Sequence, residues 1–391
     1  MPNGMRWVGL DVHAHASAVA VFDDGSGEVI TRRVVGRPPA VLDVLRSVPR
    51  PARAVYEAGP TGYGLVRRAR AEGIEMVVCS AGNIERRPGD RIKTDKRDAI
   101  RLARLFAAGD LRLVWVPSEE QEQLRDLVRC REDLRADPMR ARHRLATFLL
   151  RRERHYPGPG ERWTLKHRRW LSQQRFDDPA SRVTYADYLH GHDVLLARRE
   201  LVARELEQIA PDCVWAETIA RLRCLRGINT LTALGLCAEI GDCNRFEHPD
   251  SLACYVGLVP SEHSSGQTRR LGKITKAGST PARRLLVEAA LHYRLTPAVG
   301  GKLALRQRGQ DPGLIDHAWR IQRRLNARWN LLRNGRGKPA GIVTIAIARE
   351  LVGACWEIAT APRQSPATSL ARRGGAAVRA SRTHQRPRFR L

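Results

Sequence analysis

The sequence lacks the features that mark secreted, membrane and zinc-binding proteins. Its eight cysteines are scattered and form no Cys-x-x-Cys pair, so we expect reduced thiols rather than disulfides or a zinc site. No apolar run approaches the roughly 20 residues that a bilayer-spanning helix needs, and no apolar signal region is present at the N-terminus. These absences predict a soluble, cytoplasmic protein with no membrane partner.

Aromatic and acidic residues are also scarce. Aromatics make up 5% of the chain, so stacking on unpaired bases is not expected to dominate, although eight tryptophans leave room for some. The 68 lysines and arginines outnumber the 41 acids and give a formal charge of +27. Because such cations gain affinity for phosphates through counterion release, the excess implies a polyanionic partner that is bound mainly through its backbone.

The 391 residues are enough for two or three domains. Changes in composition divide them into an α/β domain (1–115), a helical region (116–215), a compact, mainly helical domain (216–362) and a tail (363–391). The tail holds eight arginines and no acid among Ser, Pro, Gly and Ala. It is predicted to be disordered and to touch nucleic acid without specificity.

The first domain alternates strand and helix patterns, which predicts a mixed sheet. Strands are expected at 6–11, 18–22, 28–35, 52–57 and 74–79, and helices at 64–71 and 95–109.

Four acids stand out in this domain. Asp11 closes the first predicted strand and Glu57 the fourth, and Asp95 and Asp98 share one side of the predicted helix. The aspartate pair alone fits either solvated surface acids or ligands of a hard cation such as Mg²⁺. Acids at the ends of two strands, followed by two on a later helix, are the order in which an RNase H-like fold builds a magnesium site.

The helical region has apolar residues at helical spacing over 124–134, 145–149 and 194–209. This pattern fits an antiparallel or dimeric coiled coil, or an ordinary helical bundle that links two domains. Pro138 is expected to kink or split the first helix. Residues 157–179, with two tryptophans and many basic residues, are predicted to form an irregular basic connection.

Helices are predicted at 281–293, 315–332 and 342–358 in the third domain. Around Gly227, residues 225–233 fit a helix-hairpin-helix element, whose backbone amides would face a phosphate. A tight αα-hairpin explains the same glycine.

A pair of serines, Ser264 and Ser265, precedes Gly266 in this domain. Four basic residues follow them: Arg269, Arg270, Lys273 and Lys276. A serine among glycines and cations suits attack on a phosphodiester, because the cations hold the phosphate and stabilise developing charge. The alternative is a polar turn with a hydroxyl cap.

These motifs together resemble a known family. The four acids resemble the DEDD motif of bacterial transposases of the insertion sequence 110 family, which includes the Piv-type invertases. They lie within Val8-Gly9-Leu10-Asp11-Val12-His13, Tyr56-Glu57-Ala58-Gly59 and Lys93-Thr94-Asp95-Lys96-Arg97-Asp98-Ala99. The second half has matching motifs: Gly257-Leu258-Val259-Pro260, Ser265-Gly266 and Ile274-Thr275-Lys276-Ala277-Gly278. The resemblance covers residues 5 to about 360.

The resemblance implies a RuvC-like domain, a coiled coil for assembly and a transposase domain with a catalytic serine. Asp11, Glu57, Asp95 and Asp98 would hold Mg²⁺ against the scissile phosphate. Ser265, with Ser264 as the alternative, would attack phosphorus to give a covalent phosphoserine. The implied partners are DNA (element ends and target), a guide RNA encoded by the element, and further copies of the chain in a dimer or tetramer. Contacts to nucleic acid are assigned to Lys93, Arg97, Gly227, Arg269, Arg270, Lys273 and Lys276.

Two positions depart from the family pattern. Pro138 interrupts a helix that should be continuous, and Ser279 stands where asparagine or aspartate is more usual. The serine is expected to affect only local turn geometry. Two other functions fit the same sequence: a RuvC-type metal-dependent nuclease, such as a junction resolvase, that forms no covalent intermediate, and a nucleic-acid-binding protein without activity.

Overall fold

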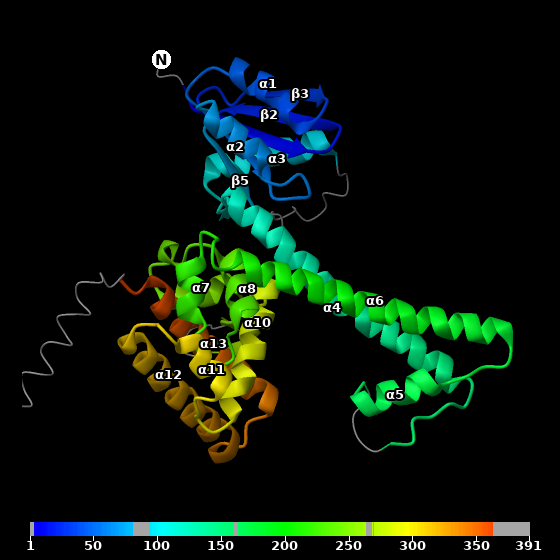
Figure 1. Cartoon of the computed structure of the whole chain (residues 1–391). Helices are drawn as coiled ribbons and strands as arrows, with labels where there is room; N and C mark the ends of the chain where they lie inside the picture. Colours follow the sequence, from blue (N-terminus) through cyan, green and yellow to red (C-terminus); the bar gives the residue numbers. More distant parts are fainter. Residues whose placement is uncertain (1–3, 81–93, 159–162, 263–267, 269, 363–391) are drawn as a thin grey trace, which may run out of the picture. The chain divides into compact units, whose positions relative to one another are not determined.

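The computed structural model describes residues 4–80, 94–158, 163–262, 268 and 270–362. It divides into two compact units, residues 1–118 and 119–391 (Figure 1). Four of the predicted site residues, Lys93, Ser264, Ser265 and Arg269, lie outside the described residues, as does the basic tail.

A mixed sheet forms the centre of the first unit, as the sequence predicts, but it has six strands where five were expected, because the short β6 was not predicted. Its strands lie in the order β3-β2-β1-β4-β5-β6. β1, β4 and β5 are parallel, and the other pairs are antiparallel. The strand bounds are β1 Arg6–Val12, β2 Ala16–Asp23, β3 Val29–Val35, β4 Ala52–Glu57, β5 Met76–Cys79 and β6 Leu113–Val114.

Helices cover both faces of this sheet. Ala54 and Tyr56 of β4 pack in the cluster that holds α1 (Val41–Ser47) and α2 (Gly64–Ala71). Val55 points the other way and packs with α3 (Asp95–Ala108). This alternation follows from the two-residue period of a strand, so a β4 that is apolar throughout requires helices on both sides.

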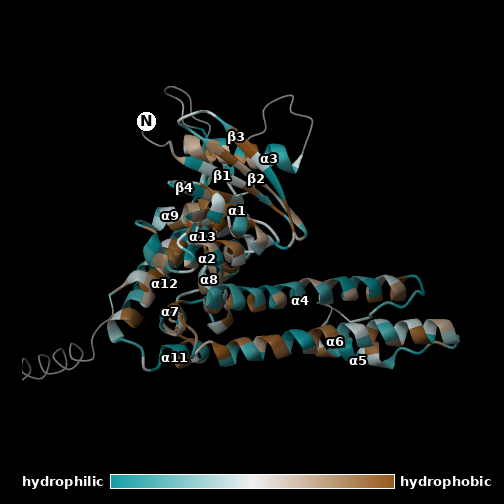
Figure 2. Cartoon of the chain, turned by 90° about the horizontal axis from the view of Figure 1, so that it is seen from above, coloured by the Kyte–Doolittle hydropathy of each residue, from teal (hydrophilic) through white to brown (hydrophobic). Residues whose placement is uncertain are grey.

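The second unit begins with two long helices, α4 (Glu119–Leu150) and α6 (Pro179–Ile209). Arg142 bonds His192, whereas Arg152, further along α4, bonds Ser181, so the two helices run antiparallel (Figure 1). Teal and brown residues alternate along both helices in Figure 2. They form an intramolecular hairpin, and the coiled coil for assembly stays a prediction.

The structure corrects three sequence expectations for this hairpin. α4 continues as one helix through the buried Pro138, so it is not split there, and a kink at this residue stays a prediction. The segment 157–179 is not irregular throughout, because it contains α5 (Leu165–Gln173), which is capped by Thr164. α6 also begins fifteen residues before the predicted 194, with Asp178 as its N-cap and Pro179 in its first turn.

The rest of the second unit is mainly helical, as predicted. Residues 233–240 of α8 are all buried, and α13 contributes a buried face to the same core. The helices are α7 Ala216–Leu222, α8 Thr230–Ile240, α9 Pro249–Tyr255, α10 Thr280–Ala290, α11 Gly301–Gln307, α12 Pro312–Asn330 and α13 Ala340–Thr360. A two-stranded hairpin of β7 (Pro260–Glu262) and β8 (Leu271–Ile274), which the sequence did not predict, precedes α10. Within the described part of the chain, no helix is long and apolar enough to span a bilayer.

Candidate functional site

Two of the predicted acids leave the sheet at one edge. β1 and β4 are parallel, with Leu10 opposite Tyr56, so the next residues, Asp11 and Glu57, follow at the same ends of neighbouring strands. The Asp11 side chain is 22% exposed, whereas Glu57 is exposed. The next strand brings Cys79 opposite Glu57, and burial, followed by the charge of Glu57, raises the pKa of that thiol to about 11.

Helix α3 brings the other two acids to this edge. It crosses β1 at Gly9, where a Cβ would overlap the carbonyl oxygen of Ala99 and lie 2.5 Å from the backbone nitrogen of Ala103. Only glycine permits so close an approach. Asp95 and Asp98 lie in the first turn of α3, which is capped by the Thr94 side chain, so this turn lies beside the end of β1.

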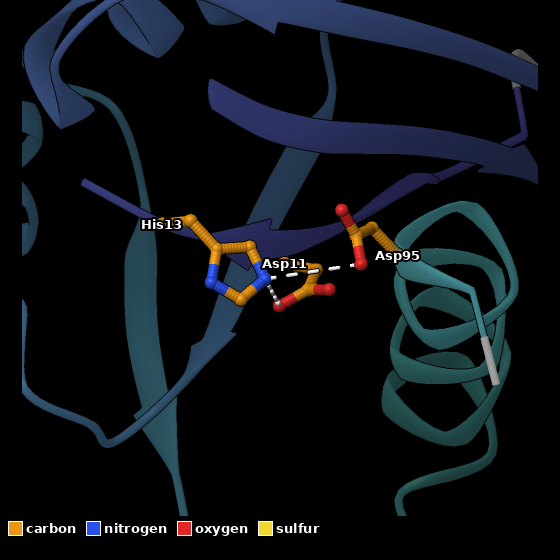
Figure 3. Close-up of side chains that lie close together, drawn as sticks. All are labelled: Asp11, His13 and Asp95. Atoms are coloured by element: carbon orange, nitrogen blue, oxygen red, sulfur yellow. Dashed lines mark ion pairs between the residues drawn. The ribbon is translucent and has the colours of Figure 1, made fainter. Parts of the chain in front are cut away.

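The structure brings Asp11, Asp95 and a third residue, His13, together (Figure 3). One ligand atom from each lies within 4.8 Å of the others. His13 Nε2 is 3.3 Å from Asp11 Oδ1 and 3.9 Å from Asp95 Oδ1. His13 follows Asp11 by two residues, just past the end of β1. The site predicted from the sequence omits it, because strand alternation does not indicate where a side chain beyond the strand's end points.

The electrostatics of the cluster favour a bound cation. Burial raises the pKa of Asp11, repulsion by Asp95 and Asp98 raises it further, and His13 partly offsets both. A carboxylate that is destabilised by neighbouring negative charge gains from a divalent cation, and carboxylate oxygens are the ligands that Mg²⁺ prefers. The donor set of Asp11 and Asp95 therefore fits a divalent metal.

Asp98 and Glu57 lie further out than this cluster. Asp98 is close enough to affect Asp11 electrostatically, and Glu57 stands on the neighbouring strand, but neither belongs to the group of ligand atoms within 4.8 Å. Arg97, between the two aspartates of α3, is exposed and donates its backbone N–H to Thr94 Oγ1. The four-carboxylate metal set stays a prediction.

A groove of about 580 Å³ lies beside the acids. Residues 16–19 of β2, residues 31–33 on β3 and the start of α3 at 94–96 line it. Arg32, Arg33 and Lys96 are exposed there, and Asp95 belongs to the same wall. Cations next to a cluster of acids suit a phosphate backbone that passes over the acids.

The described basic residues of the predicted serine site lie on and beside β8: Arg270 precedes it, Lys273 lies on it and Lys276 follows it. Arg270, Lys273 and Lys276 are all exposed. The segment that would carry Ser264 and Ser265 joins β7 to β8, so these serines belong by sequence to the loop of a hairpin whose second strand is basic. Their role, and that of the three cations, stays a prediction.

Two glycines fix this hairpin to the helical core. Gly257 has φ +68°, and a Cβ there would lie 2.5 Å from the backbone nitrogen of Ala277. Gly278 has φ +71°, and a Cβ there would overlap the carbonyl oxygen of Tyr255. The segment before β7 and the segment after β8 therefore cross in backbone contact, and each crossing point requires glycine.

A buried glutamate, for which no sequence pattern indicates a role, lies under this crossing. Glu239, with 1% of its side chain exposed, accepts two hydrogen bonds from Arg129, at 2.8 and 3.1 Å. Ser279 donates to Glu239 Oε2 at 2.8 Å and caps α10. Burial disfavours the Glu239 carboxylate, but the bonds from Arg129 and Ser279 and the charge of Arg125 outweigh it and lower its pKa. The expectation that Ser279 affects only turn geometry is wrong, because it ties α10 to α8.

Packing accounts for Gly227. Its φ is +84°, and a Cβ there would lie 2.5 Å from the Ala289 carbonyl oxygen of α10. Asn229 then caps α8 by accepting a bond from the Thr232 amide. α7 and α8 thus form a helical hairpin, and a phosphate contact at Gly227 stays a prediction.

Comparison with known proteins identifies similarity in both units. Residues 8–152 match a DEDD transposase family, and residues 219–299 match the transposase IS116/IS110/IS902 family. A Sinorhizobium fredii protein, y4qE, which is provisionally named a transposase, is 39% identical over 364 residues, covering 92% of this chain and 90% of that protein. The transposase for insertion sequence element IS1533 of Leptospira borgpetersenii is 31% identical over 319 residues, covering 79% of this chain and 91% of that protein.

Proposed function

The chain belongs to the IS116/IS110/IS902 family of insertion-sequence transposases, and we propose that it cuts and rejoins DNA with a Mg²⁺ site and a serine nucleophile. The ligands would be Asp11, Glu57, Asp95 and Asp98, and the nucleophile Ser265 or Ser264. The observation that carries the proposal is the position of Asp95 beside Asp11. It supports the metal part directly, whereas the serine part rests on the resemblance.

Each group would have a defined task. Mg²⁺ supplies Lewis acidity and a template for the scissile phosphate. Asp11 and Asp95 would hold the ion, and Arg33 and Lys96 would hold the phosphate backbone in the neighbouring groove.

The serine step balances without an external energy source. The serine Oγ loses its proton and forms a bond to phosphorus, while the phosphorus bond to one sugar oxygen breaks and that oxygen takes up a proton. The phosphodiester energy stays in the phosphoserine, so attack by another sugar hydroxyl reverses the step and rejoins DNA. Lys273 stands on β8, which follows the serines, with Arg270 just before that strand and Lys276 just after it, and all three would stabilise the phosphate.

The same proposal includes two partners. An RNA of the element would select the element ends and the target, and the protein would act as a dimer or tetramer. The formal charge of +27 supports a large polyanionic partner. The acids and the serines are far apart in the sequence, so acids of one protomer and the serine of another can form one site.

A covalent-trapping assay tests the proposal. Protein, Mg²⁺, the candidate RNA and labelled element-end DNA are incubated, denatured and resolved by size, for wild type, Ser265→Ala, Ser264→Ala and Asp11→Asn. We expect a protein-linked DNA band that Asp11→Asn and one serine variant lose. The serine variant without the band identifies the nucleophile.

Other outcomes assign a different function. Free cleaved ends with no linked species, unchanged when both serines are alanine, would identify a metal-only nuclease. Binding without cleavage that survives loss of all four acids would identify a nucleic-acid-binding protein.

A further inference from the structure

The far end of the α4–α6 hairpin, where α5 packs, carries an aromatic cluster that the proposed chemistry does not use (Figure 1). Four rings belong to it: Tyr156, Trp163, His167 and Trp170. They come from a stretch of fifteen residues in a chain with 5% aromatics. We call the cavity that they line the tip pocket.

The rings form a connected set around His167. Its ring stacks on Trp170 at 5.6 Å and 26°. Tyr156 and Trp163 meet it edge to face, at 4.9 and 5.3 Å. Tyr156 also meets Trp170 edge to face at 5.6 Å. An edge-to-face contact uses the face of only one of its two rings, and the stack with His167 covers one face of Trp170, so its other face is the one considered for a further flat partner.

The pocket suits a small planar ligand. Its volume is about 250 Å³, which is below the roughly 300–1,000 Å³ of pockets for drug-sized ligands and suits a single ring system. All four rings line it, and Trp163 and Trp170 are only partly buried. A duplex end is too large to enter.

The pocket is electrostatically positive. Arg154 and His155, both exposed, line it beside the rings, and no Asp or Glu is among the described residues that do so. Four further cations of the same segment are exposed: Arg151, Lys166, Arg168, which pairs with Asp193, and Arg169. One exposed acid, Glu153, lies between them in the sequence. This combination of flat rings with surrounding cations favours a ligand that is planar and anionic.

Trp163 is held in place at a conformational cost. Its φ is +72°, a region that bulky residues rarely adopt. Its backbone N–H donates to His167 Nδ1 at 3.1 Å, and the Arg142 guanidinium lies 4.8 Å from its ring centroid. His192 of α6 packs against the same ring at 4.5 Å. Fixed aromatic faces lose little entropy on binding, so such positioning favours recognition.

The tip has an apolar core against which Trp163 and Trp170 pack, so these two pocket rings lie at its edge rather than at its centre. Phe148 of α4, Leu171 of α5 and Tyr185 of α6 are buried in that core. Tyr185 donates to the Leu171 carbonyl oxygen and thereby fixes α5 to α6. Tyr156, Trp163 and Trp170 are partly open to solvent, whereas His167 is buried.

We propose that the tip pocket binds one unpaired base of a single-stranded nucleic acid, which stacks on Trp170 while Arg154 and the neighbouring cations contact the flanking phosphates. RNA and DNA share this chemistry, and the test separates them. The inference stands on the tip alone and needs neither the metal site nor the serine.

Photo-cross-linking of the wild-type protein is the primary test. Dodecamers of RNA and of DNA that carry one 5-iodouracil are irradiated with the full chain in EDTA, so no metal-dependent step contributes. Trypsin separates the rings, because Tyr156 falls in peptide 155–162, Trp163 in 163–166 and Trp170 in 170–175. We expect cross-links in these peptides. Cross-links confined to other peptides would overturn the proposal.

Binding measurements supply a second test at about 0.5 M salt, where phosphate contacts weaken but stacking persists. Trp170→Ala should raise Kd for the single strands roughly 5- to 150-fold. Trp170→Phe should recover most of the loss, and duplex binding should be unchanged. Leu165→Ala is the matched control, because Leu165 is exposed on the same helix and does not line the pocket.

The two polymers are compared in both assays. Tighter binding of RNA would show that the pocket also recognises the 2′-hydroxyl group. Equal binding would show that it recognises unpaired bases of either polymer. Equal weakening of duplex and single strand by Trp170→Ala, or no weakening at all, would sink the proposal.

Discussion

Gly9 of β1 lies so close to Ala99 of α3 that a Cβ on the glycine would overlap the alanine carbonyl oxygen. Asp11 follows Gly9 by two residues, and Asp95 precedes Ala99 by one helical turn. The absence of a side chain at Gly9 therefore sets the distance between the two carboxylates of the candidate metal site.

Gly9→Ala should both destabilise the first unit and separate the acids. The added methyl meets backbone atoms of α3, which cannot rotate away, so we expect a loss of about 1–3 kcal/mol in the free energy of unfolding. Mg²⁺ binding, measured by calorimetry, should weaken as well. Gly64→Ala is the control, since a Cβ at Gly64 meets nothing within 4 Å, and it should neither lower stability nor weaken Mg²⁺ binding.

Asp11→Asn should stabilise the metal-free protein at neutral pH although it removes a proposed ligand. The folded-state pKa of Asp11 is raised, so its ionised form is less stable in the folded chain than in the unfolded chain. The amide removes that penalty, and thermal melting in EDTA at pH 7 should show a higher Tm than wild type. A lower Tm would contradict burial and carboxylate repulsion as the origin of the raised pKa.

The same shift fixes a pH dependence. The folded state holds the Asp11 proton more tightly, so the contribution of Asp11 to stability increases as pH falls through the raised folded pKa towards the unfolded value of 3.8. Mg²⁺ should raise Tm at pH 7 in wild type and not in Asp11→Asn. Comparing the two proteins across pH 4–7 isolates this contribution.

Glu239 should show the opposite sign. Its folded pKa is lowered, so its contribution is present above the unfolded value of 4.5 and is lost as pH falls through the folded value. Arg129→Ala leaves the buried carboxylate with fewer partners and should cost about 1–3 kcal/mol at pH 7. Arg140→Ala removes an exposed pair with Asp137 on the same helix and should cost under about 1 kcal/mol. Equal costs in urea unfolding would show that burial of Glu239 is immaterial.

Pro138→Ala should stabilise the long hairpin. Pro138 lies inside α4 and donates no hydrogen bond to the preceding turn, so alanine restores one bond and removes a steric clash. We expect a gain of up to about 3 kcal/mol. Met139→Ala is the control, because Met139 is half exposed in the same turn and should change stability little. A destabilised Pro138→Ala would mean that contacts of the proline ring outweigh the backbone bond.

Local patterns in the sequence predict β1 to β5, the long helices and the clustering of Asp11 with Asp95, but not the two-residue β6. Periodicity reports which face of an element is buried, and parallel neighbours bring their ends together. The sequence did not predict α5, because the apolar residues of this nine-residue helix are interspersed with basic ones. The sequence did not predict the β7–β8 hairpin, because its strands have three and four residues, too few to show an alternating pattern.

The contacts that the sequence did not predict are long-range. Glu239 meets Ser279 across forty residues and Arg129 across 110. A glutamate at the end of an apolar helix gives no sign of its partners, since pairing depends on how α4, α8 and α10 pack. The same holds at position 227, where glycine is required because Ala289 of α10 leaves no room for a Cβ.

The crossing of Gly257 and Gly278 restricts how this chain can diverge. Each glycine faces the backbone of the opposite segment, and backbone atoms cannot be exchanged for smaller ones. A side chain gained at one position therefore finds no compensating change at the other, and no sequence of single tolerated steps leads away from the pair. We therefore expect relatives to keep both glycines together. A change that shifts one segment against the other would break the backbone contact between the β7–β8 hairpin and the helical core.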